Sequence, residues 1–220
     1  MTDDIKIMAV KVAGDWELDV LAIPFDSVDS DRQYFDANTE IMAETFKTPL
    51  LAYYHGILPD NTGMQPEPVL PGKITNVEKQ SDGWHVRVLL DKTLELAGKL
   101  WEAAKKGLLA ASSGSIAHLA RLEVGGKLYP YDKNRPGRIA VWPFAELSLI
   151  DIAEGRRPAN QYAVAMPVMK SRYQQAGESL PEIADEPEPE AAGSGGEEKP
   201  EPIKPITENK EMEQIGRAHV

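Results

Sequence analysis

The stretch Trp84-His-Val-Arg-Val-Leu-Leu90 carries the clearest structural signal in the chain. Every second residue from Trp84 to Leu90 is apolar, which is the period of a strand with one buried face. Ser81-Asp-Gly83 just before it is a turn sequence, and Lys73–Lys79 lies on the other side of that turn. The pattern therefore predicts a β-hairpin formed by 73–79 and 84–90.

Working outward from this hairpin, strand signals dominate the sequence. The further predicted strands are Trp16–Ile23, Leu50–Tyr54, a segment from Ser112 onward, Arg138–Trp142 and Glu146–Ile152. Two helices are predicted: Thr93–Lys106, with an apolar stripe and a glycine after it, and a shorter one at Asn38–Phe46 capped by Asn38. Because strands and helices do not alternate regularly, the prediction is an α+β fold, a β-rich barrel-like domain with a few flanking helices.

The composition changes sharply after Lys170. Most of the chain's net charge of −11 lies beyond this point, in a segment rich in Pro, Glu and Gly. Such a segment has little to bury, so we expect residues 1–170 to fold and residues 171–214 to be a disordered acidic linker or tether. The last residues, Ile215–Val220, read like a translated sequencing adapter, so we expect the natural C-terminus to be missing and give His219 no role.

Composition also limits the function classes. An acidic chain with pI near 4.9 and no basic block does not favour nucleic acid as a partner. The absence of cysteine excludes disulfides, thiolate metal sites and a cysteine nucleophile. No apolar run approaches the ~20 residues that span a bilayer, and no signal peptide is evident, so we expect a cytoplasmic protein without membrane contact. No phosphate-binding loop or metal-ligand cluster is present in the sequence, so no cofactor or metal is expected.

Three segments place a reactive side chain at the end of an apolar stretch: Pro49–Gly56 with His55, Gly107–Ser115 with three serines, and Trp142–Asp151 with Glu146. A histidine followed by glycine can hold its ring in a cleft as a general base, although a lone histidine at a strand end is more often structural. A buried glutamate needs a partner, which could be an imidazole or one of the arginines at 121 and 138.

The serine segment is the candidate for a nucleophile. Ser112, Ser113 and Ser115 surround Gly114. A serine nucleophile needs an exposed hydroxyl at a sharp backbone feature and nearby N–H groups for the oxyanion, and glycine permits both. The competing interpretation is an ordinary turn of small residues.

In this order and spacing, the three segments resemble the prohead proteases of tailed bacteriophages, the HK97-type family, whose fold is similar to that of the herpesvirus assembly protease. The family motifs are Pro-Leu-Leu-x-x-x-His, Gly-x-x-x-x-Ser-x-Gly after a helix, and Glu-x-Ser-Leu. They correspond here to Pro49–His55, Gly107–Gly114 and Glu146–Leu149. The resemblance covers about Ala22 to Val168. The sequence departs from the commoner pattern at Ser115, where a bulky aromatic usually follows the glycine, and in the tyrosines before the histidine.

The resemblance implies Ser112 as nucleophile, His55 as base and Glu146 as the orienting acid. Ser113 and Ser115 remain rival nucleophiles, and His118 remains a rival third member, because the herpesvirus relatives use a second histidine. On a continuous strand His118 would lie about 20 Å from Ser112, which favours Glu146. His85 points away from the apolar face of its strand.

The implied function is that of a serine endopeptidase that cleaves scaffold and capsid-protein extensions, with its own acidic tail as a further candidate substrate, inside the assembling prohead in the host cytoplasm. Its implied partners are the major capsid protein and a scaffolding protein, with a homodimer as a further candidate because the herpesvirus relatives dimerise. The alternative is a catalytically silent assembly protein with the same fold. A small esterase is disfavoured because the chain lacks a Gly-x-Ser-x-Gly nucleophile elbow.

Overall fold

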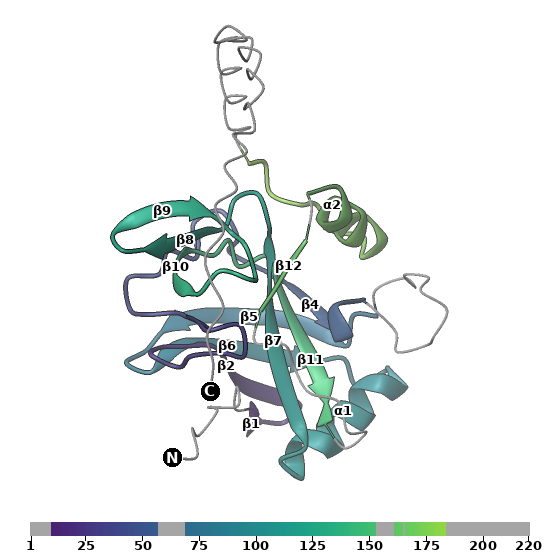
Figure 1. The fold of residues 1–220 in the computed structure, drawn as a ribbon. Helices are drawn as coiled ribbons and strands as arrows, with labels where there is room; N and C mark the ends of the chain where they lie inside the picture. Colours follow the sequence, from purple (N-terminus) through teal and green to yellow (C-terminus); the bar gives the residue numbers. More distant parts are fainter. Residues whose placement is uncertain (1–9, 57–68, 153–160, 165, 184–220) are drawn as a thin grey trace, which may run out of the picture. The chain divides into compact units, whose positions relative to one another are not determined.

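The structure is a computed structural model that describes residues 10–56, 69–152, 161–164 and 166–183. These residues belong to one compact unit, 1–183 (Figure 1). The described strands are β1 (Val10–Gly14), β2 (Glu17–Pro24), β3 (Gln33–Tyr34), β4 (Leu50–Tyr53), β5 (Gly72–Lys79), β6 (Gly83–Leu90), β7 (Leu109–Ile116), β8 (Arg121–Val124), β9 (Lys127–Pro130), β10 (Gly137–Val141), β11 (Glu146–Asp151) and β12 (Gln161–Val164). The helices are α1 (Glu95–Lys105), α2 (Met166–Gln175) and the 3₁₀ turn η1 (Tyr54–Gly56).

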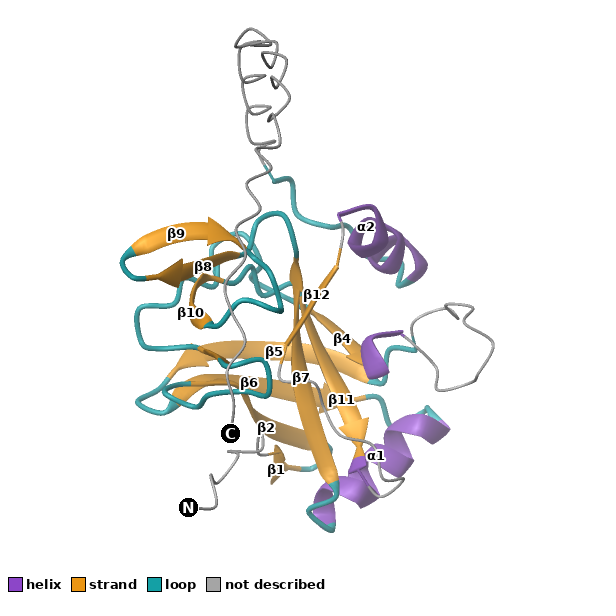
Figure 2. Ribbon diagram, in the orientation of Figure 1, coloured by secondary structure: helices purple, strands orange, loops and turns teal. Residues whose placement is uncertain are grey.

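The described strands form three four-stranded sheets, ordered β1-β2-β6-β5, β3-β10-β8-β9 and β12-β7-β11-β4 (Figure 2). Strands predominate and the α-helices flank them, so the predicted β-rich α+β class is confirmed, although the sheets do not close into a barrel. None of the helices in the described part of the chain has the length and apolar character needed to cross a membrane.

The hairpin that anchors the first sheet forms as predicted. β5 and β6 pair antiparallel, and the Gln80 N–H donates to the Gly83 carbonyl at the turn. Val86, Val88 and Leu90 are buried, whereas Arg87 between them is exposed. The alternation of apolar and polar residues therefore corresponds to the buried face and the exposed face of the strand. Helix α1 also forms where its stripe predicted, burying Ala97, Leu100 and Ala104 and ending before Gly107, which has φ 68°.

The third sheet separates two hydrophobic clusters, because alternate residues of its strands point to opposite faces. One face of β7 and its neighbours contributes Ala111, Leu147 and Leu149 to the main core. The other face contributes Leu50 and Ile116 to a second cluster. The second cluster also contains Phe46, Leu119, Ala145, Met169 and Tyr173, the last two from α2. Helix α2 therefore covers this second face.

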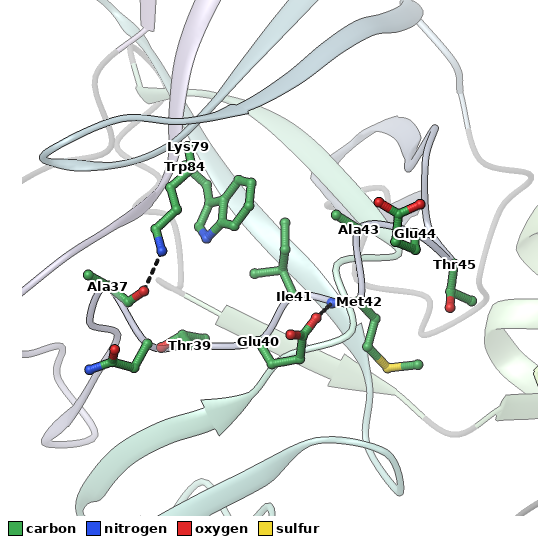
Figure 3. A pocket seen from close by; sticks show the side chains of 11 residues that line it. Ala37, Thr39, Glu40, Ile41, Met42, Ala43, Glu44, Thr45, Lys79 and Trp84 are labelled. Carbon is green, nitrogen blue, oxygen red and sulfur yellow. Dashed lines mark hydrogen bonds between the residues drawn. The ribbon is translucent and has the colours of Figure 1, made fainter.

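The predicted helix at Asn38–Phe46 is wrong. The segment is extended at Glu40, which forms a parallel bridge with Val141, and its N–H and carbonyl bond Ala140 and Trp142. It borders an open pocket with Lys79 and Trp84, where Lys79 Nζ donates to the Ala37 carbonyl at 2.5 Å (Figure 3). Pairing with a strand about a hundred residues away outweighs the local helix signal.

The expected domain boundary at residue 170 lies too early in the chain. Helix α2 runs through it to Gln175, and the described fold continues to Ile183. Arg172 and Tyr173, which we had assigned to the disordered linker, are buried. The remainder of that linker from Ala184 onward, and the adapter-like end 215–220, lie outside the described residues.

Candidate active site

His55 lies in the 3₁₀ turn η1, which follows β4, and has an unusual backbone conformation. Tyr54 and His55 both have positive φ, 48° and 55°, a region that costs a non-glycine residue roughly 1–3 kcal/mol. Two bonds from β11 hold the turn: the His55 N–H donates to Ser148 Oγ at 2.5 Å, and the Tyr54 hydroxyl donates to the Asp151 carbonyl at 2.6 Å. The neighbouring strand thus stabilises the strained backbone that carries the histidine.

The His55 ring contacts Glu146 at the start of β11. Nδ1 lies 2.6 Å from Glu146 Oε1, and both side chains are buried. An ionised carboxylate only accepts hydrogen bonds, so the proton of this contact belongs to Nδ1. In the neutral ring this leaves the Nε2 lone pair as the proton acceptor, which is the tautomer a general base requires.

A second partner keeps Glu146 charged inside the protein. Arg172 of α2 donates from Nη1 to Glu146 Oε2 at 2.8 Å, and the arginine side chain is itself buried. Burial acts to raise the pKa of Glu146, but the hydrogen bond and charge of His55, together with the charge of Arg172, outweigh it and hold that pKa below its ordinary value. Each carboxylate oxygen therefore has its own buried partner.

The strand register places the three candidate serines on two different faces. Ser148 lies opposite Ser112, and Glu146 lies opposite Gly114, so Ser112 shares the face of Glu146 and of the Ser148 hydroxyl that holds His55. Ser113 lies opposite Leu147 and, with Ser115, faces the main core. Because residues directly opposite each other project to the same side, only Ser112 of the three lies on the histidine face.

The chain matches no protein-family model, no curated protein and no solved structure.

The strand predicted from Ser112 onward forms as β7, so neither the sharp backbone feature expected of a nucleophile nor the competing turn of small residues occurs at these serines. Ser112 to Gly114 lie within the regular strand β7, and Ser112 is fully buried rather than exposed. β7 also lies between β11 and β12. Backbone N–H groups of a central strand point in the plane of the sheet toward its neighbours, so Ser113 and Gly114 do not present the oxyanion donors that we expected on the face.

Gly114 has a different role from the predicted one. A Cβ built on it would lie 2.8 Å from Glu146 Cβ and 3.4 Å from Glu146 Oε1. The glycine of the Ser-x-Gly motif therefore provides the space into which the Glu146 side chain passes.

The remaining candidate residues lie apart from this cluster. His118 is exposed in the turn after β7, where its carbonyl accepts a bond from Arg121. His85 lies on the first sheet beside Asp19 and Asp82. Arg138, one of the two arginines considered as partners for Glu146, pairs instead with Asp36 and Glu123.

Sequence reasoning assigned no role to two residues of the site, Ser148 and Arg172. Ser148 could have been found, because it follows Glu146 by two residues and so shares its face. The signal for Arg172 was the helical spacing of Met166, Met169, Tyr173 and Ala176 across the apparent composition boundary.

The open pocket of Figure 3 includes none of Ser112, His55 and Glu146. Among the described residues, no group of three or more histidine, aspartate and glutamate side chains is placed to hold a metal ion.

Proposed function

We propose that this protein is a serine endopeptidase with Ser112 as nucleophile, His55 as general base and Glu146 as the group that orients the histidine. The observation that carries the proposal is the buried 2.6 Å contact between His55 Nδ1 and Glu146 Oε1, formed on the one face of the sheet that also bears Ser112. A nucleophile, a base and a third group that fixes the base form the arrangement used for acyl transfer.

In this mechanism the Ser112 hydroxyl attacks a peptide carbonyl while His55 Nε2 accepts its proton. The same nitrogen then returns the proton to the leaving amine, and an acyl-enzyme ester remains on Ser112. Water, deprotonated in turn by His55, hydrolyses the ester and regenerates the serine. Glu146 keeps the proton on Nδ1 and stabilises the imidazolium that forms in each half of the cycle.

The resemblance to the phage prohead proteases suggests the biological substrate. We propose that the protein cleaves scaffold and capsid-protein extensions during capsid maturation, within the prohead in the host cytoplasm, and that the acidic segment after the domain is a self-cleavage substrate or a tether. The ordered set of three motifs supports this proposal, since Ser112, His55 and Glu146 are the positions at which the motifs carry reactive groups.

A second candidate function is that of a catalytically silent assembly protein. The observation that favours it is burial: Ser112 and Glu146 are 0% exposed and His55 is 7% exposed. A peptide reaches Ser112 only when part of the covering structure moves. The same contacts would also serve as a buried polar network that specifies the packing of the sheet.

Labelling with a fluorophosphonate, which reacts with activated serines, separates the two functions. The tryptic peptide Gly107–Arg121 contains all three serines, and its fragmentation identifies the modified one. We expect modification at Ser112, loss of labelling in Ser112→Ala and in His55→Ala, and retention in Ser113→Ala and His118→Ala.

The biological proposal is tested by co-expression with the cognate major capsid protein, wild type and Ser112→Ala in parallel. Intact masses should show shortened capsid protein or a trimmed chain only with the wild type. A folded wild-type protein that neither labels nor cleaves, in the presence of capsid protein, would establish the silent assembly role instead.

A further inference from the structure

Helix α2 contacts the start of β11 through two consecutive side chains. Arg172 donates to Glu146 Oε2 at 2.8 Å, and the Tyr173 hydroxyl donates to the Ala145 carbonyl at 2.6 Å. Both donors are buried, and Met169 one turn earlier packs in the same cluster. The helix therefore binds the backbone and the side chain of β11 at the point where the strand presents its carboxylate.

The two oxygens of Glu146 are divided between two elements of the fold. Oε1 faces His55 of η1 and Oε2 faces Arg172 of α2. A carboxylate held at one oxygen can still rotate about its terminal bond, whereas one held at both has a defined plane. Gly114, which also lies against Glu146, has no side chain that could restrict the rotation of the carboxylate. Arg172 thus supplies the second point that fixes the carboxylate plane.

We propose that Arg172 is a positioning residue, which orients Glu146 so that Oε1 accepts the His55 Nδ1 proton, and that α2 is therefore a part of the active site. This inference rests on the proposed peptidase function for its effect on activity. The orientation itself is measurable without any reaction.

A salt bridge that served only stability would leave the chemistry of the histidine unchanged. A positioning role has a further consequence, because Arg172 also keeps the buried Glu146 ionised. Among the residues that the structure describes, the charged or titratable groups that face Glu146 from the elements around it are His55, Arg172 and Tyr173. Removing the arginine charge takes away one of the causes that lower the pKa of Glu146, so in the variant the carboxylate is protonated at higher pH.

The full chain supplies a matched control on the same helix. Lys170 is exposed and lies two residues before Arg172, so Lys170→Gln and Arg172→Gln each remove one positive charge from α2. Arg172→Lys retains the charge with a different donor geometry. Urea unfolding first establishes that every variant is folded. Proton NMR then follows the low-field resonance of His55 Nδ1–H, and fluorophosphonate labelling of Ser112 is timed as a function of pH.

We expect Arg172→Gln to lose or broaden the Nδ1–H resonance and to slow labelling by about 100-fold, which is the cost of a misplaced catalytic group. We also expect the acid limb, the pH range in which the labelling rate falls on acidification, to move to higher pH. Arg172→Lys should restore the position of the acid limb and part of the rate, and Lys170→Gln should match the wild type.

Two outcomes separate this inference from the proposed function. A folded Arg172→Gln protein with an unchanged resonance and an unchanged pH profile overturns the positioning role, even if Ser112 labels normally. A wild type that does not label, but whose resonance is lost only in Arg172→Gln, supports the positioning role while the peptidase proposal fails.

Discussion

Gly114 and Glu146 lie directly opposite each other on β7 and β11, and the glycine has no room for even one additional carbon atom on the side of the glutamate. The contact concerns the Cβ of Glu146, which belongs to the base of the side chain and cannot rotate away. Gly114 is therefore required by the carboxylate across the sheet and not by a turn of its own strand.

Gly114→Ala should accordingly displace Glu146. Its methyl group would meet Glu146 Cβ at 2.8 Å, and we expect a loss of about 1–3 kcal/mol in the free energy of unfolding together with loss of Ser112 labelling. The control is Gly98→Ala in helix α1, where an added Cβ meets nothing within 4 Å, and where alanine should stabilise by about 1 kcal/mol. Urea unfolding measures both; equal effects of the two substitutions would contradict the steric account.

Ser148→Ala should impair the site through the backbone of His55. The variant leaves the buried His55 N–H without the Ser148 hydroxyl and releases a turn with positive φ, at a cost of about 1–3 kcal/mol. We expect slower labelling of Ser112 with an unchanged acid limb, because the contact of the ring with Glu146 persists. Ser148→Thr retains a hydroxyl and suits a strand, so it should recover most of the rate. A Ser148→Ala protein that labels at the wild-type rate would show that the turn needs no such support.

The stability of the fold should depend on the charge of Glu146 at acid pH. Its pKa is lowered in the folded protein from an ordinary value of 4.5, so its contribution is complete above that value and is lost as the pH falls through the lower folded value. The difference in unfolding free energy between the wild type and Glu146→Gln should be constant near neutrality and shrink below about pH 4.5. Asp91 and Glu95 also have lowered pKa values, but they are present in both proteins and cancel. If the difference in unfolding free energy grew as the pH fell, it would contradict a lowered pKa of Glu146 in the folded protein.

Ser113 and Ser115 should be dispensable. Their hydroxyls are buried on the core face, and no described residue hydrogen-bonds them. Replacing either with alanine removes an unsatisfied polar group, so stability should be unchanged or raised by about 1 kcal/mol, with Ser112 labelling intact. Thermal unfolding and labelling of the two single variants check this. Loss of labelling in Ser113→Ala alone would reassign the nucleophile.

Truncation should define the end of the folded domain. A chain ending at Ile183 keeps α2 and the second cluster, and we expect it to unfold cooperatively and to label at Ser112. A chain ending at Lys170 loses Arg172 and Tyr173, and removal of the tyrosine alone should cost about 3 kcal/mol or more. Comparable labelling by the two chains would exclude a role for α2.

Elements defined by local pattern could be predicted from the sequence. The β5–β6 hairpin and helix α1 each combine a hydrophobic period with their own turn or end signal, and both form where expected. The Asn38–Phe46 segment has a local signal too, but its backbone groups pair with a strand about a hundred residues away. Local propensity is decisive only where distant hydrogen bonds do not compete with it.

The candidate site shows the same limit. His55, Ser112 and Glu146 were chosen from separate segments, and the His55–Glu146 contact is a tertiary one that no window of sequence contains. Gly114 was expected to permit a sharp backbone feature and oxyanion donors, because its actual constraint, the Glu146 side chain, lies on another strand. Arg172 was missed because the acidic composition beyond it concealed the helical spacing of a segment that packs on the domain.

β7 is paired on both sides, and the register of this pairing must be correct for Ser112 to lie on the face of His55. β11 pairs antiparallel with β7 from Leu109 to Gly114, and β12 pairs parallel with it from Ser113 to Ile116. A slip of one residue would turn Ser112 into the core and bring Ser113 to the histidine, yielding a chain with the same composition and a different reactive hydroxyl. Because the chain itself is unchanged, the misregistered protein would have the same mass as the native one. The pairing of β7 with β11 and β12 therefore determines which serine hydroxyl faces His55.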